Sequence, residues 1–461
     1  MTMKYQVVNP ATGQVEKEYP TATDAEIREI LDRAGRGYTA WRRTSMAERA
    51  DILRRVAQIY KERSAELAAI ITREMGKVTA EAKGELRFTG TIYKYYAENG
   101  ADLLKDEPLQ SNTPGTALVR RSPIGALLGI MPWNYPYYQV ARFAAPNLMI
   151  GNTIVLKHAP QCPESASVME QIFREAGVPD DAYINVFATN EQVAEIIADP
   201  RIAGVSVTGS ERAGSAVAAT AGQHLKKVVL ELGGSDPFIV LDGADLPSVA
   251  KAAAAARMSN GGQACNASKR MIVTEGVYDD FMSEFTAAMS GYKTGDPTDP
   301  ATAYGPLSSE NAARNLMEQI NDAVGKGATV HLGGHRVDGP GAFVEATVLS
   351  DVTPQMRAYH EELFGPAAVV YKVADADEAV ELANSSSYGL GGAVFSSDED
   401  LALDVADRLD VGMVWINRPE GGGPELPFGG TKRSGVGREL GPLGIDEFVN
   451  KKLIHTKPGA E

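Results

Sequence analysis

Residues 226–240 read KKVVLELGGSDPFIV, two short apolar runs separated by a polar turn that contains two glycines. Val228 to Leu230 form the first run, and Phe238 to Val240 form the second. Short continuous runs bounded by turn residues are typical of strands that are buried on both faces. The stretch therefore predicts two strands of parallel sheet, with the carboxylate of Glu231 at the end of the first.

Similar runs recur upstream and alternate with amphipathic helical segments. Strand-like runs occur at Thr153–Leu156 and Val205–Val207. One helix is predicted to begin at the capping box Ser45–Glu48, to carry an apolar stripe from Ile52 to Ile71, and to end at Gly76. This alternation predicts an α/β fold in which helices cover parallel sheets.

One segment interrupts the α/β alternation. The stretch QSNTPG at residues 110–115 is rich in turn-forming residues and has an extended piece on each side. We therefore expect a β-hairpin at this point of the chain.

Composition bounds the class of protein. The chain has 461 residues, 44% hydrophobic and 23% charged, which allows roughly two to four domains. Its net charge of −15 argues against binding to nucleic acid or to an anionic membrane. No apolar run reaches the ~18 residues of a membrane span, and the first ten residues carry no secretory signal. The two cysteines exclude a disulfide framework, so the cytoplasm is the expected compartment. From the charge and the lack of a long apolar run, we expect no nucleic-acid or membrane partner.

Cys265, at the end of the stretch NGGQAC, is a candidate nucleophile. A thiol needs a lowered pKa or a nearby base to react, and glycines allow backbone amides to approach it. A single cysteine is more often an inert core residue, but the polar and turn-forming residues before Cys265 favour the nucleophile. Cys162 lies between two prolines and is expected to be structural.

Glu231 has two interpretations. Its place at a strand end, followed by two glycines, suits a carboxylate that faces a cleft. It also follows Gly209 at about the spacing of the acid that binds the ribose in a Rossmann unit. However, Gly209 to Gly214 read G-x-x-x-x-G and not G-x-G-x-x-G, so spacing alone does not make Glu231 a cofactor ligand.

Two further polar residues stand at strand ends. Asn134 follows Met131, Pro132 and Trp133, and its amide is a potential oxyanion donor. Lys157 ends the run that begins at Thr153 and is able to hold a ribose hydroxyl. Taken singly, each is equally well a turn asparagine or a surface lysine.

The motifs taken in order resemble the aldehyde dehydrogenase superfamily over essentially the whole chain. KHAP at residues 157–160 and ELGGSDPF at 231–238 are most similar to the bacterial succinate-semialdehyde dehydrogenase branch. The matching blocks are PWN at 132–134, LK at 156–157, TGS at 208–210, ELGG at 231–234, GQxC at 262–265, EELFGP at 361–366, PFGG at 427–430 and SGxGRE at 434–439.

The resemblance implies three structural parts. An NAD(P)-binding, Rossmann-like domain is expected at residues 1–108 and 129–233, and an α/β catalytic domain at 234–440. The hairpin at 109–128 matches the family's β-hairpin oligomerisation arm, and residues 441–461 would supply its partner strand. An exposed two-stranded arm is marginal in water, so we expect a homo-oligomer, either a dimer or a tetramer.

The resemblance also implies a mechanism. Cys265 would attack the aldehyde, the Asn134 side chain and the Cys265 backbone amide would hold the oxyanion, and Glu231 would activate water to hydrolyse the thioester. The positions that match cofactor-binding residues of the family are Trp133, Lys157, Gly209, Ser210, Leu232, Glu362 and Phe364.

Two departures from the family pattern bear on cofactor and substrate. Pro160 stands where many NAD-preferring relatives carry a glutamate that binds the adenosine ribose, so either NAD or NADP is expected. Arg142 matches an arginine that binds the distal carboxylate of succinate semialdehyde, and Tyr138 is expected beside it. Ser259 and Gly422, however, replace an arginine and a serine that assist in relatives.

The sequence thus predicts NAD(P)-dependent oxidation of succinate semialdehyde or a related semialdehyde. Tyr135, Tyr137 and Tyr138 leave open a broad-specificity aliphatic or aromatic aldehyde dehydrogenase. A CoA-acylating enzyme is disfavoured by Glu231, which acylating relatives commonly lack.

Arg418 is either a neighbour of the substrate mouth or a solvated loop charge. We expect no metal site, because two glycines between His331 and His335 form a turn and not a helix face.

Overall fold

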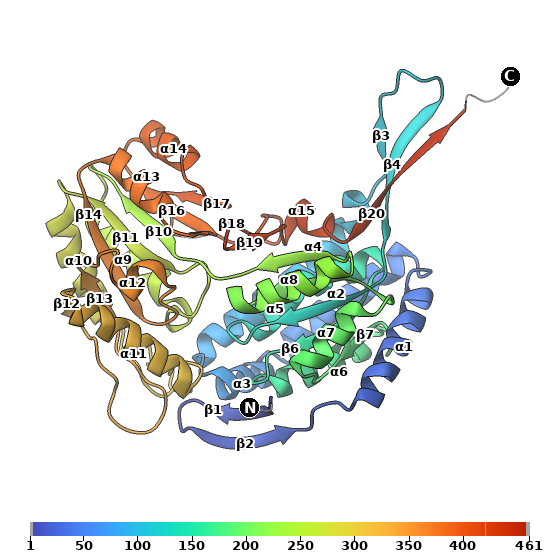
Figure 1. Ribbon diagram of the computed structural model, residues 1–461, viewed down its shortest axis with the longest axis horizontal. Coiled ribbons are helices and arrows are strands. Elements are labelled where there is room, and N and C mark those ends of the chain that lie inside the picture. The colour runs from blue at the N-terminus through green and yellow to red at the C-terminus, as the bar shows by residue number, and fades with distance from the viewer. Residues whose placement is uncertain (1–2, 420, 458–461) are drawn as a thin grey trace.

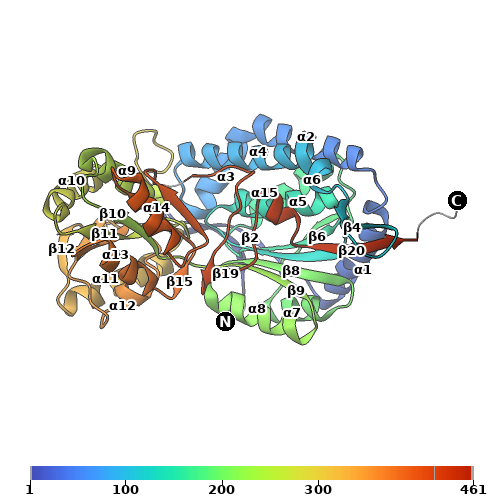
Figure 2. The ribbon, with the colours of Figure 1, turned by 90° about the horizontal axis from the view of Figure 1, so that it is seen from above.

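Two parallel sheets, each covered by helices on both faces, organise the computed structural model, which describes residues 3–419 and 421–457 (Figure 1 and Figure 2). We call the part built around the six-stranded sheet the N-terminal lobe, and the part built around the seven-stranded sheet the C-terminal lobe. A three-stranded arm projects from the N-terminal lobe. The α/β fold with a hairpin arm, as expected from the sequence, is confirmed.

The sheet of the N-terminal lobe has a doubly wound strand order. Its strands lie in the order β19-β9-β8-β5-β6-β7, and every neighbouring pair except β19 and β9 is parallel. From β5 the chain adds β6 and β7 on one side, and then β8 and β9 on the other, so the strand order reverses between β5 and β8. Open α/β sheets bind ligands at the carboxyl ends of the strands beside such a reversal. The strands are β5 (Ala126–Met131), β6 (Thr153–His158), β7 (Tyr183–Asn185), β8 (Ile202–Thr208), β9 (Lys227–Glu231) and β19 (Gly435–Val436).

Helices on the two faces of this sheet enclose two separate apolar cores. Leu127 and Leu128 of β5 enter opposite cores, because successive side chains of a strand point to opposite faces. The helices of this lobe are α1 (Asp24–Trp41), α2 (Met46–Glu62), α3 (Ser64–Met75), α4 (Thr79–Leu103), α5 (Pro136–Ile150), α6 (Pro163–Ala176), α7 (Asn190–Ala198), α8 (Glu211–Gln223) and α15 (Gly441–Ile445).

The C-terminal lobe repeats this arrangement around the order β12-β13-β14-β11-β10-β16-β17, in which only β12 is antiparallel to its neighbour. Phe238 and Val240 of β10 enter one core and Ile239 enters the other. The strands are β10 (Asp236–Val240), β11 (Ser268–Thr274), β12 (Thr329–Leu332), β13 (Thr347–Ser350), β14 (Ala367–Val373), β16 (Gly391–Phe395) and β17 (Met413–Ile416). The helices are α9 (Leu246–Met258), the 3-10 turn η1 (Ser259–Gly262), α10 (Tyr278–Ser290), α11 (Glu310–Gly325), α12 (Arg357–His360), α13 (Ala376–Asn384) and α14 (Glu399–Asp407).

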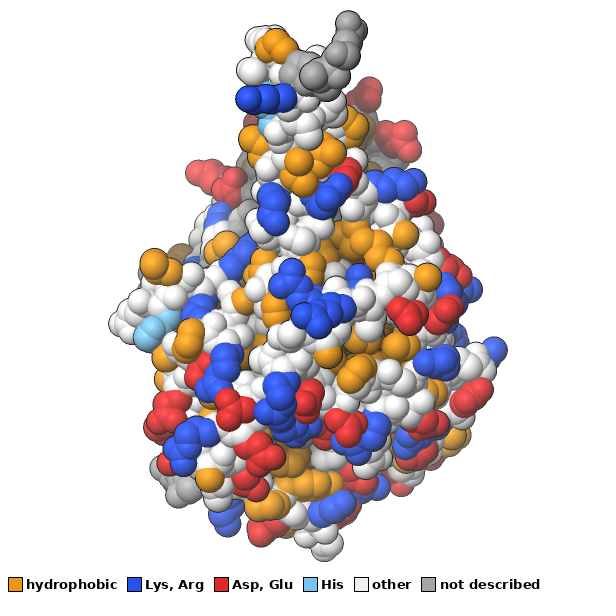
Figure 3. Space-filling view, turned by 90° about the vertical axis from the view of Figure 1, so that its right-hand side faces the viewer, with side chains coloured by type: hydrophobic (Ala, Val, Ile, Leu, Met, Phe, Trp, Pro, Cys, Tyr) orange, Lys and Arg blue, Asp and Glu red, His pale blue; other side chains and the backbone are white. Residues whose placement is uncertain are grey.

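The arm is an antiparallel sheet in which β4 lies between β3 and β20. Figure 3 shows apolar side chains among lysines and arginines on this arm. Leu453 of β20 is 63% exposed and Leu109 of β3 is 40% exposed. The arm strands are β3 (Glu107–Leu109), β4 (Thr116–Pro123) and β20 (Val449–Thr456), and two further strand pairs are formed by β1 (Tyr5–Asn9) with β2 (Gln14–Tyr19) and by β15 (Tyr388–Gly389) with β18 (Thr431–Lys432).

Three segments pack differently from what the expected domain boundaries imply. The arm was expected at 109–128, but residues 126–128 belong to β5, whose nearly all-buried side chains make it a central strand of the N-terminal sheet. Residues 435–436 were expected in the catalytic part, but they pair with β9 in the same N-terminal sheet. Helix α15, at 441–445, packs on α5 and not on the arm.

The local signals at helix ends are confirmed, with one difference. Ser45 and Glu48 form the reciprocal capping box, and α3 ends at Gly76 in the left-handed conformation. The apolar stripe from Ile52 to Ile71 was expected in one helix, but Arg63 has φ −93° and ψ 13° and separates α2 from α3. Within the described residues, no helix is both long enough and apolar enough to cross a bilayer.

Candidate active site

The carboxyl ends of the N-terminal strands bring most of the predicted residues together. Asn134 follows β5, Lys157 lies near the end of β6, Gly209 and Ser210 follow β8, and Glu231 ends β9. Because β6, β5, β8 and β9 are neighbours in this order, these residues share one edge of the sheet at the reversal of the strand order. Topology therefore unites motifs that are far apart in the sequence.

The loop that carries Cys265 has an unusual backbone. Asn260, Gly261 and Gly262 all have positive φ, at 52°, 62° and 76°. This left-handed conformation is favourable for glycine and tolerated by asparagine, whose side chain here donates to the backbone oxygens of Asn134 at 2.9 Å and Gln263 at 3.2 Å. The NGGQ lead-in is thus a structural requirement of the turn that presents Cys265.

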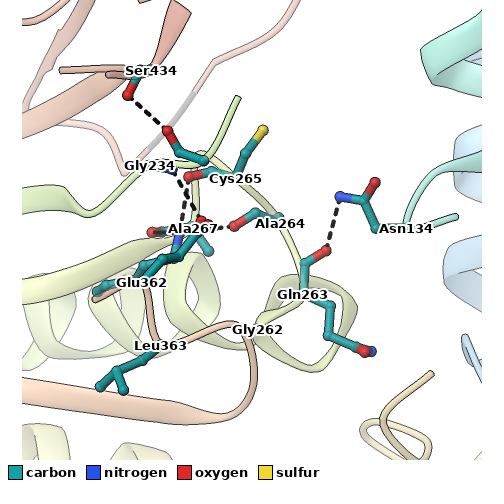
Figure 4. A network of polar contacts seen from close by, with 12 residues as sticks. Asn134, Gly234, Gly262, Gln263, Ala264, Cys265, Ala267, Glu362, Leu363 and Ser434 are labelled. Carbon is teal, nitrogen blue, oxygen red and sulfur yellow. Dashed lines mark hydrogen bonds and ion pairs between the residues drawn. The ribbon is translucent and has the colours of Figure 1, made fainter. Parts of the chain in front are cut away.

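Asn134 contacts the same loop. Its Nδ2 donates to the Gln263 carbonyl oxygen at 3.1 Å, and the side chain is almost fully buried. Figure 4 shows Asn134 approaching Gln263 from the opposite lobe, and the Cys265 side chain pointing away from its own carbonyl oxygen. An amide nitrogen carries two protons, so one proton of Nδ2 is still available to another acceptor.

Cys265 opens onto a cavity of about 890 Å³ between the lobes. Helices α4 and α5 supply Phe88, Tyr138 and Arg142, and the C-terminal part of the chain supplies Phe428. Tyr135, Ser259, Arg418 and Gly422 also line this cavity, whereas Tyr137 is fully buried in the core of the N-terminal lobe.

Charged groups of both signs act on the pKa of the Cys265 thiol. Burial raises the pKa of the Cys265 thiol to about 12, and the carboxylates of Glu362 and Glu231 act in the same direction. Arg142 and Lys269 lower this pKa, because a positive charge favours the thiolate. In this state the thiol is protonated at neutral pH, so a reaction at Cys265 needs a base or a change in its surroundings.

Glu231 is a buried carboxylate without hydrogen-bond partners among the described residues. Burial raises the pKa of Glu231 well above its ordinary value, and the neighbouring Glu439 raises it further. Its side chain lies against Gly429 and does not line the Cys265 cavity. Buried polar groups are nearly always paired, so an unpaired buried carboxylate that acts on the Cys265 thiol indicates a functional group.

Arg142 already has an acidic partner. Its Nε lies 2.6 Å from Glu439 Oε2, and both side chains are buried. The guanidinium also stacks on the Phe428 ring at 4.1 Å and lies 5.0 Å from the centre of the Tyr138 ring. Arg142 Nη2 makes no hydrogen bond to the described residues, so one donor of this cavity-lining side chain remains unused.

The predicted cofactor positions also fit a dinucleotide. Lys157 is buried, burial lowers the pKa of its ammonium group to about 8, and it makes no hydrogen bond or ion pair with the described residues. Ser210 caps α8, so the amino end of that helix faces the same edge of the sheet. A buried amine that makes no hydrogen bond within the described residues is suited to a ribose hydroxyl or a phosphate.

The remaining predicted positions lie on the two sides of the lobe junction. The rings of Trp133 and Phe364 meet edge to face, with their centres 5.6 Å apart. Leu232 donates its backbone N–H to Ser434, and Glu362 Oε1 accepts the N–H of Gly234 at 3.1 Å. EELFGP and ELGG, which are distant in sequence, are therefore in direct contact.

Three buried charged residues near Cys265 were not singled out from the sequence: Lys269, Arg257 and Glu439. Lys269 stands near the start of β11, a strand in which every residue is buried, and a fully buried cation is a signal of a specific partner. Glu439 lies inside the SGxGRE block, whose side chains were not assigned roles. Within the described residues there is no cluster of three or more His, Cys, Asp or Glu that could hold a metal ion.

Comparison with known proteins agrees with this geometry. The model of the aldehyde dehydrogenase family matches residues 2–454. A protein of Deinococcus radiodurans named succinate-semialdehyde dehydrogenase [NADP(+)] is 56% identical over 98% of this chain and 95% of its own length. One of the same name from Mycobacterium avium is 43% identical over 98% and 96%.

Solved structures agree as well. The succinic semialdehyde dehydrogenase of Streptococcus pyogenes, solved in complex with NADP+, superposes with a TM-score of 0.96. It is 42% identical and covers 98% of this chain and 100% of its own. The chain therefore belongs to the aldehyde dehydrogenase family.

Proposed function

We propose that this aldehyde dehydrogenase oxidises succinate semialdehyde to succinate with NADP+, through a thioester on Cys265. The observation that carries the proposal is that Cys265 opens onto a cavity that also contains Arg142, a buried arginine with an unused donor. The relatives named above, at 43–56% identity over nearly the whole chain, support the choice of substrate and cofactor.

In the proposed reaction the Cys265 thiolate adds to the aldehyde carbon, and the carbonyl oxygen becomes an oxyanion. The free proton of Asn134 Nδ2 and the Cys265 backbone N–H stabilise this charge. The nicotinamide, when bound, accepts the hydride that leaves the substrate carbon. The carbon is thereby oxidised to a thioester on Cys265, and attack by water releases the carboxylic acid and restores the thiol.

Glu231 is the proposed base for that water. In its buried position against Gly429 the carboxyl group has a pKa well above its ordinary value, because burial disfavours the charged form. To accept a proton it must rotate toward the cavity, where water and the cofactor pocket restore its ionised form. We therefore assign Glu231 to the hydrolysis step that follows hydride transfer, and not to the initial addition of the thiolate.

The dinucleotide would be held along the strand edge by Lys157, Ser210, Gly209, Leu232 and Trp133. The nicotinamide ribose and ring would be held by Glu362 and Phe364. Lys157 supports this assignment most directly, since a buried ammonium group that makes no hydrogen bond within the described residues is stabilised by a phosphate or ribose oxygen. With Pro160 three residues later, no carboxylate at that position repels a 2′-phosphate. This favours NADP, although NAD is not repelled either.

Arg142 and Tyr138 are the proposed substrate-binding residues. A charge-assisted hydrogen bond from Arg142 Nη2 to the distal carboxylate is worth about 1.5–3 kcal/mol, or roughly ten- to a hundred-fold in specificity. The second candidate function is oxidation of uncharged aldehydes. It is favoured by the Arg142–Glu439 ion pair, which balances the guanidinium, and by the aromatic rings of Phe88, Tyr138 and Phe428 in the cavity.

The deciding experiment measures formation of the reduced cofactor with succinate semialdehyde and with butanal, using NADP+ or NAD+, with and without CoA. We expect kcat/KM to favour succinate semialdehyde with NADP+, no dependence on CoA, and a ten- to hundred-fold loss of that preference in Arg142→Leu. Cys265→Ala should retain less than roughly a hundredth of the rate. A wild-type preference for butanal would favour the second candidate, and an unchanged ratio in Arg142→Leu would mean that Arg142 is only a structural arginine.

We also propose that the N-terminal lobe is the cofactor domain, the C-terminal lobe the catalytic domain, and the arm a contact between subunits of a cytoplasmic homo-oligomer. Exposed Leu453 and Leu109 on a three-stranded sheet support this, since such a sheet is more stable when another chain pairs with it or covers it. Light scattering at micromolar concentration should give a multiple of the chain mass of 49.1 kDa. The monomer mass would refute the arm's role.

A further inference from the structure

Lys269 is a buried lysine at the centre of the contacts that hold the Cys265 loop. It occupies the second position of β11, and its side chain is 1% exposed. Its Nζ donates to the backbone oxygens of Cys265 at 2.8 Å, Ala264 at 2.9 Å and Ala267 at 3.1 Å. All three acceptors belong to one tight turn, so a single ammonium group fixes the path of the backbone around Cys265.

The same ammonium group reaches a second loop. Glu362 Oε1 lies 3.1 Å from Lys269 Nζ and also accepts the N–H of Gly234 at 3.1 Å. Figure 4 shows Glu362, Gly234, Ala264 and Cys265 gathered around this point. Three segments, GQxC, EELFGP and ELGG, therefore meet at one buried ion pair.

We propose that Lys269 is a positioning residue that holds the Cys265 loop against Glu362 and sets the charge beside the Cys265 thiol. The proposal rests on the function proposed above, in which Cys265 is the nucleophile and Glu362 holds the cofactor ribose. A lysine that only filled space would not need four oxygen acceptors within 3.1 Å. Lys269 thereby couples the cofactor loop to the reactivity of the thiol.

The electrostatics give Lys269 and Glu362 opposite effects. Lys269 lowers the pKa of the Cys265 thiol, whereas Glu362 raises it. The other charged groups that act on the thiol are Arg142 from α5, which lowers its pKa, and Glu231 from β9, which raises it. Around Lys269 itself the charged groups are Glu362, Arg257 and Asp236. Removing one member of the Lys269–Glu362 pair should therefore shift the thiol pKa in a direction that depends on which member is removed.

The experiment measures the rate of alkylation of Cys265 by iodoacetamide against pH in the apoenzyme, with peptide mapping to separate it from the fully buried Cys162. In Lys269→Met we expect the apparent thiol pKa to rise by about one unit, which makes alkylation at neutral pH roughly ten-fold slower. In Glu362→Gln we expect a shift of similar size in the opposite direction. A purely structural role for the pair would move both variants the same way.

Arg270 provides a matched control. It is the next residue of β11, its buried guanidinium donates to the Leu382 and Ala383 carbonyl oxygens, and it faces away from Cys265. Arg270→Met should lower the melting temperature but leave the pH profile of alkylation unchanged. Lys269→Gln, which keeps N–H donors and loses the charge, gives the same readout if Lys269→Met does not fold.

Two outcomes are distinguishable. If the profiles of Lys269→Met and Lys269→Gln superpose on the wild type, or shift no more than Arg270→Met, the proposal is wrong. If alkylation of Cys265 leaves aldehyde oxidation intact, the proposed function fails, while the effect of Lys269 on the thiol can still be read from the same curves.

Discussion

Gly234→Ala should inactivate the enzyme without unfolding it. A Cβ at this position would lie 2.4 Å from the Cys265 carbonyl oxygen and 2.9 Å from Asp236 Oδ1. A carbon and an oxygen that are not bonded need about 3.2 Å, so the Cys265 loop must shift by roughly 0.8 Å, since the backbone oxygen is not the end of a flexible chain. A misplacement of about 1 Å at reacting atoms can cost on the order of a hundred-fold in rate. We therefore expect kcat to fall by roughly that factor.

The assay measures kcat, the fraction of reactive Cys265 thiol and the melting temperature of the same preparation. Gly222→Ala is the control, because nothing lies within 4 Å of its Cβ and it is inside helix α8. It should keep full activity and gain up to about 1 kcal/mol in stability. The reasoning is refuted if Gly234→Ala keeps more than half of the wild-type kcat, or if it loses activity only because it is unfolded.

Three other predictions follow from buried charges. Glu231→Gln should slow steady-state turnover but leave a burst of reduced cofactor in rapid-mixing experiments; loss of the burst would mean that Glu231 is needed to activate the thiol. Glu439→Leu leaves Arg142 buried without its partner and should cost about 3–5 kcal/mol in urea unfolding, more than the double variant Arg142→Leu/Glu439→Leu, in which no charge is left unpaired. Lys157 has a pKa lowered to about 8, so it is charged below that pH and neutral above it; the KM for NADP+ should rise as pH increases through 8, and a KM independent of pH would contradict this.

The sequence was sufficient to predict the strands but not their distribution between sheets. The runs at 228–230 and 238–240 are confirmed as parts of β9 and β10. They are nevertheless strands of different sheets, because β9 pairs with β8 and β10 pairs with β11 and β16. Local periodicity reports burial and says nothing about which distant segment supplies the hydrogen bonds, so only the family resemblance, and not the pattern of the residues, suggests a boundary within ELGG.

The same limit applies to the candidate site, where the sequence indicates the type of residue but not its partner in space. Cys265, Asn134 and Glu231 were selected by motif, and the structure places all three near the lobe junction. The ion pair between Arg142 and Glu439 could not be anticipated, since neither residue shows its partner in the local pattern. It changes the expectation for Arg142, whose charge is already balanced and whose Nη2 makes no hydrogen bond within the described residues.

The position of ELGG at the lobe crossing explains why its residues are so constrained. Glu231 ends the last parallel strand of the N-terminal sheet, and five residues later Asp236 begins a central strand of the C-terminal sheet. The two glycines between them must therefore pass through the space where both lobes present their loops. A Cβ at Gly233 would lie 2.4 Å from Glu362 Oε2, and one at Gly234 would meet the Cys265 carbonyl oxygen. These glycines allow the Cys265 loop and the EELFGP loop to lie in contact with ELGG, which is a different demand from that of a phosphate-binding glycine fingerprint.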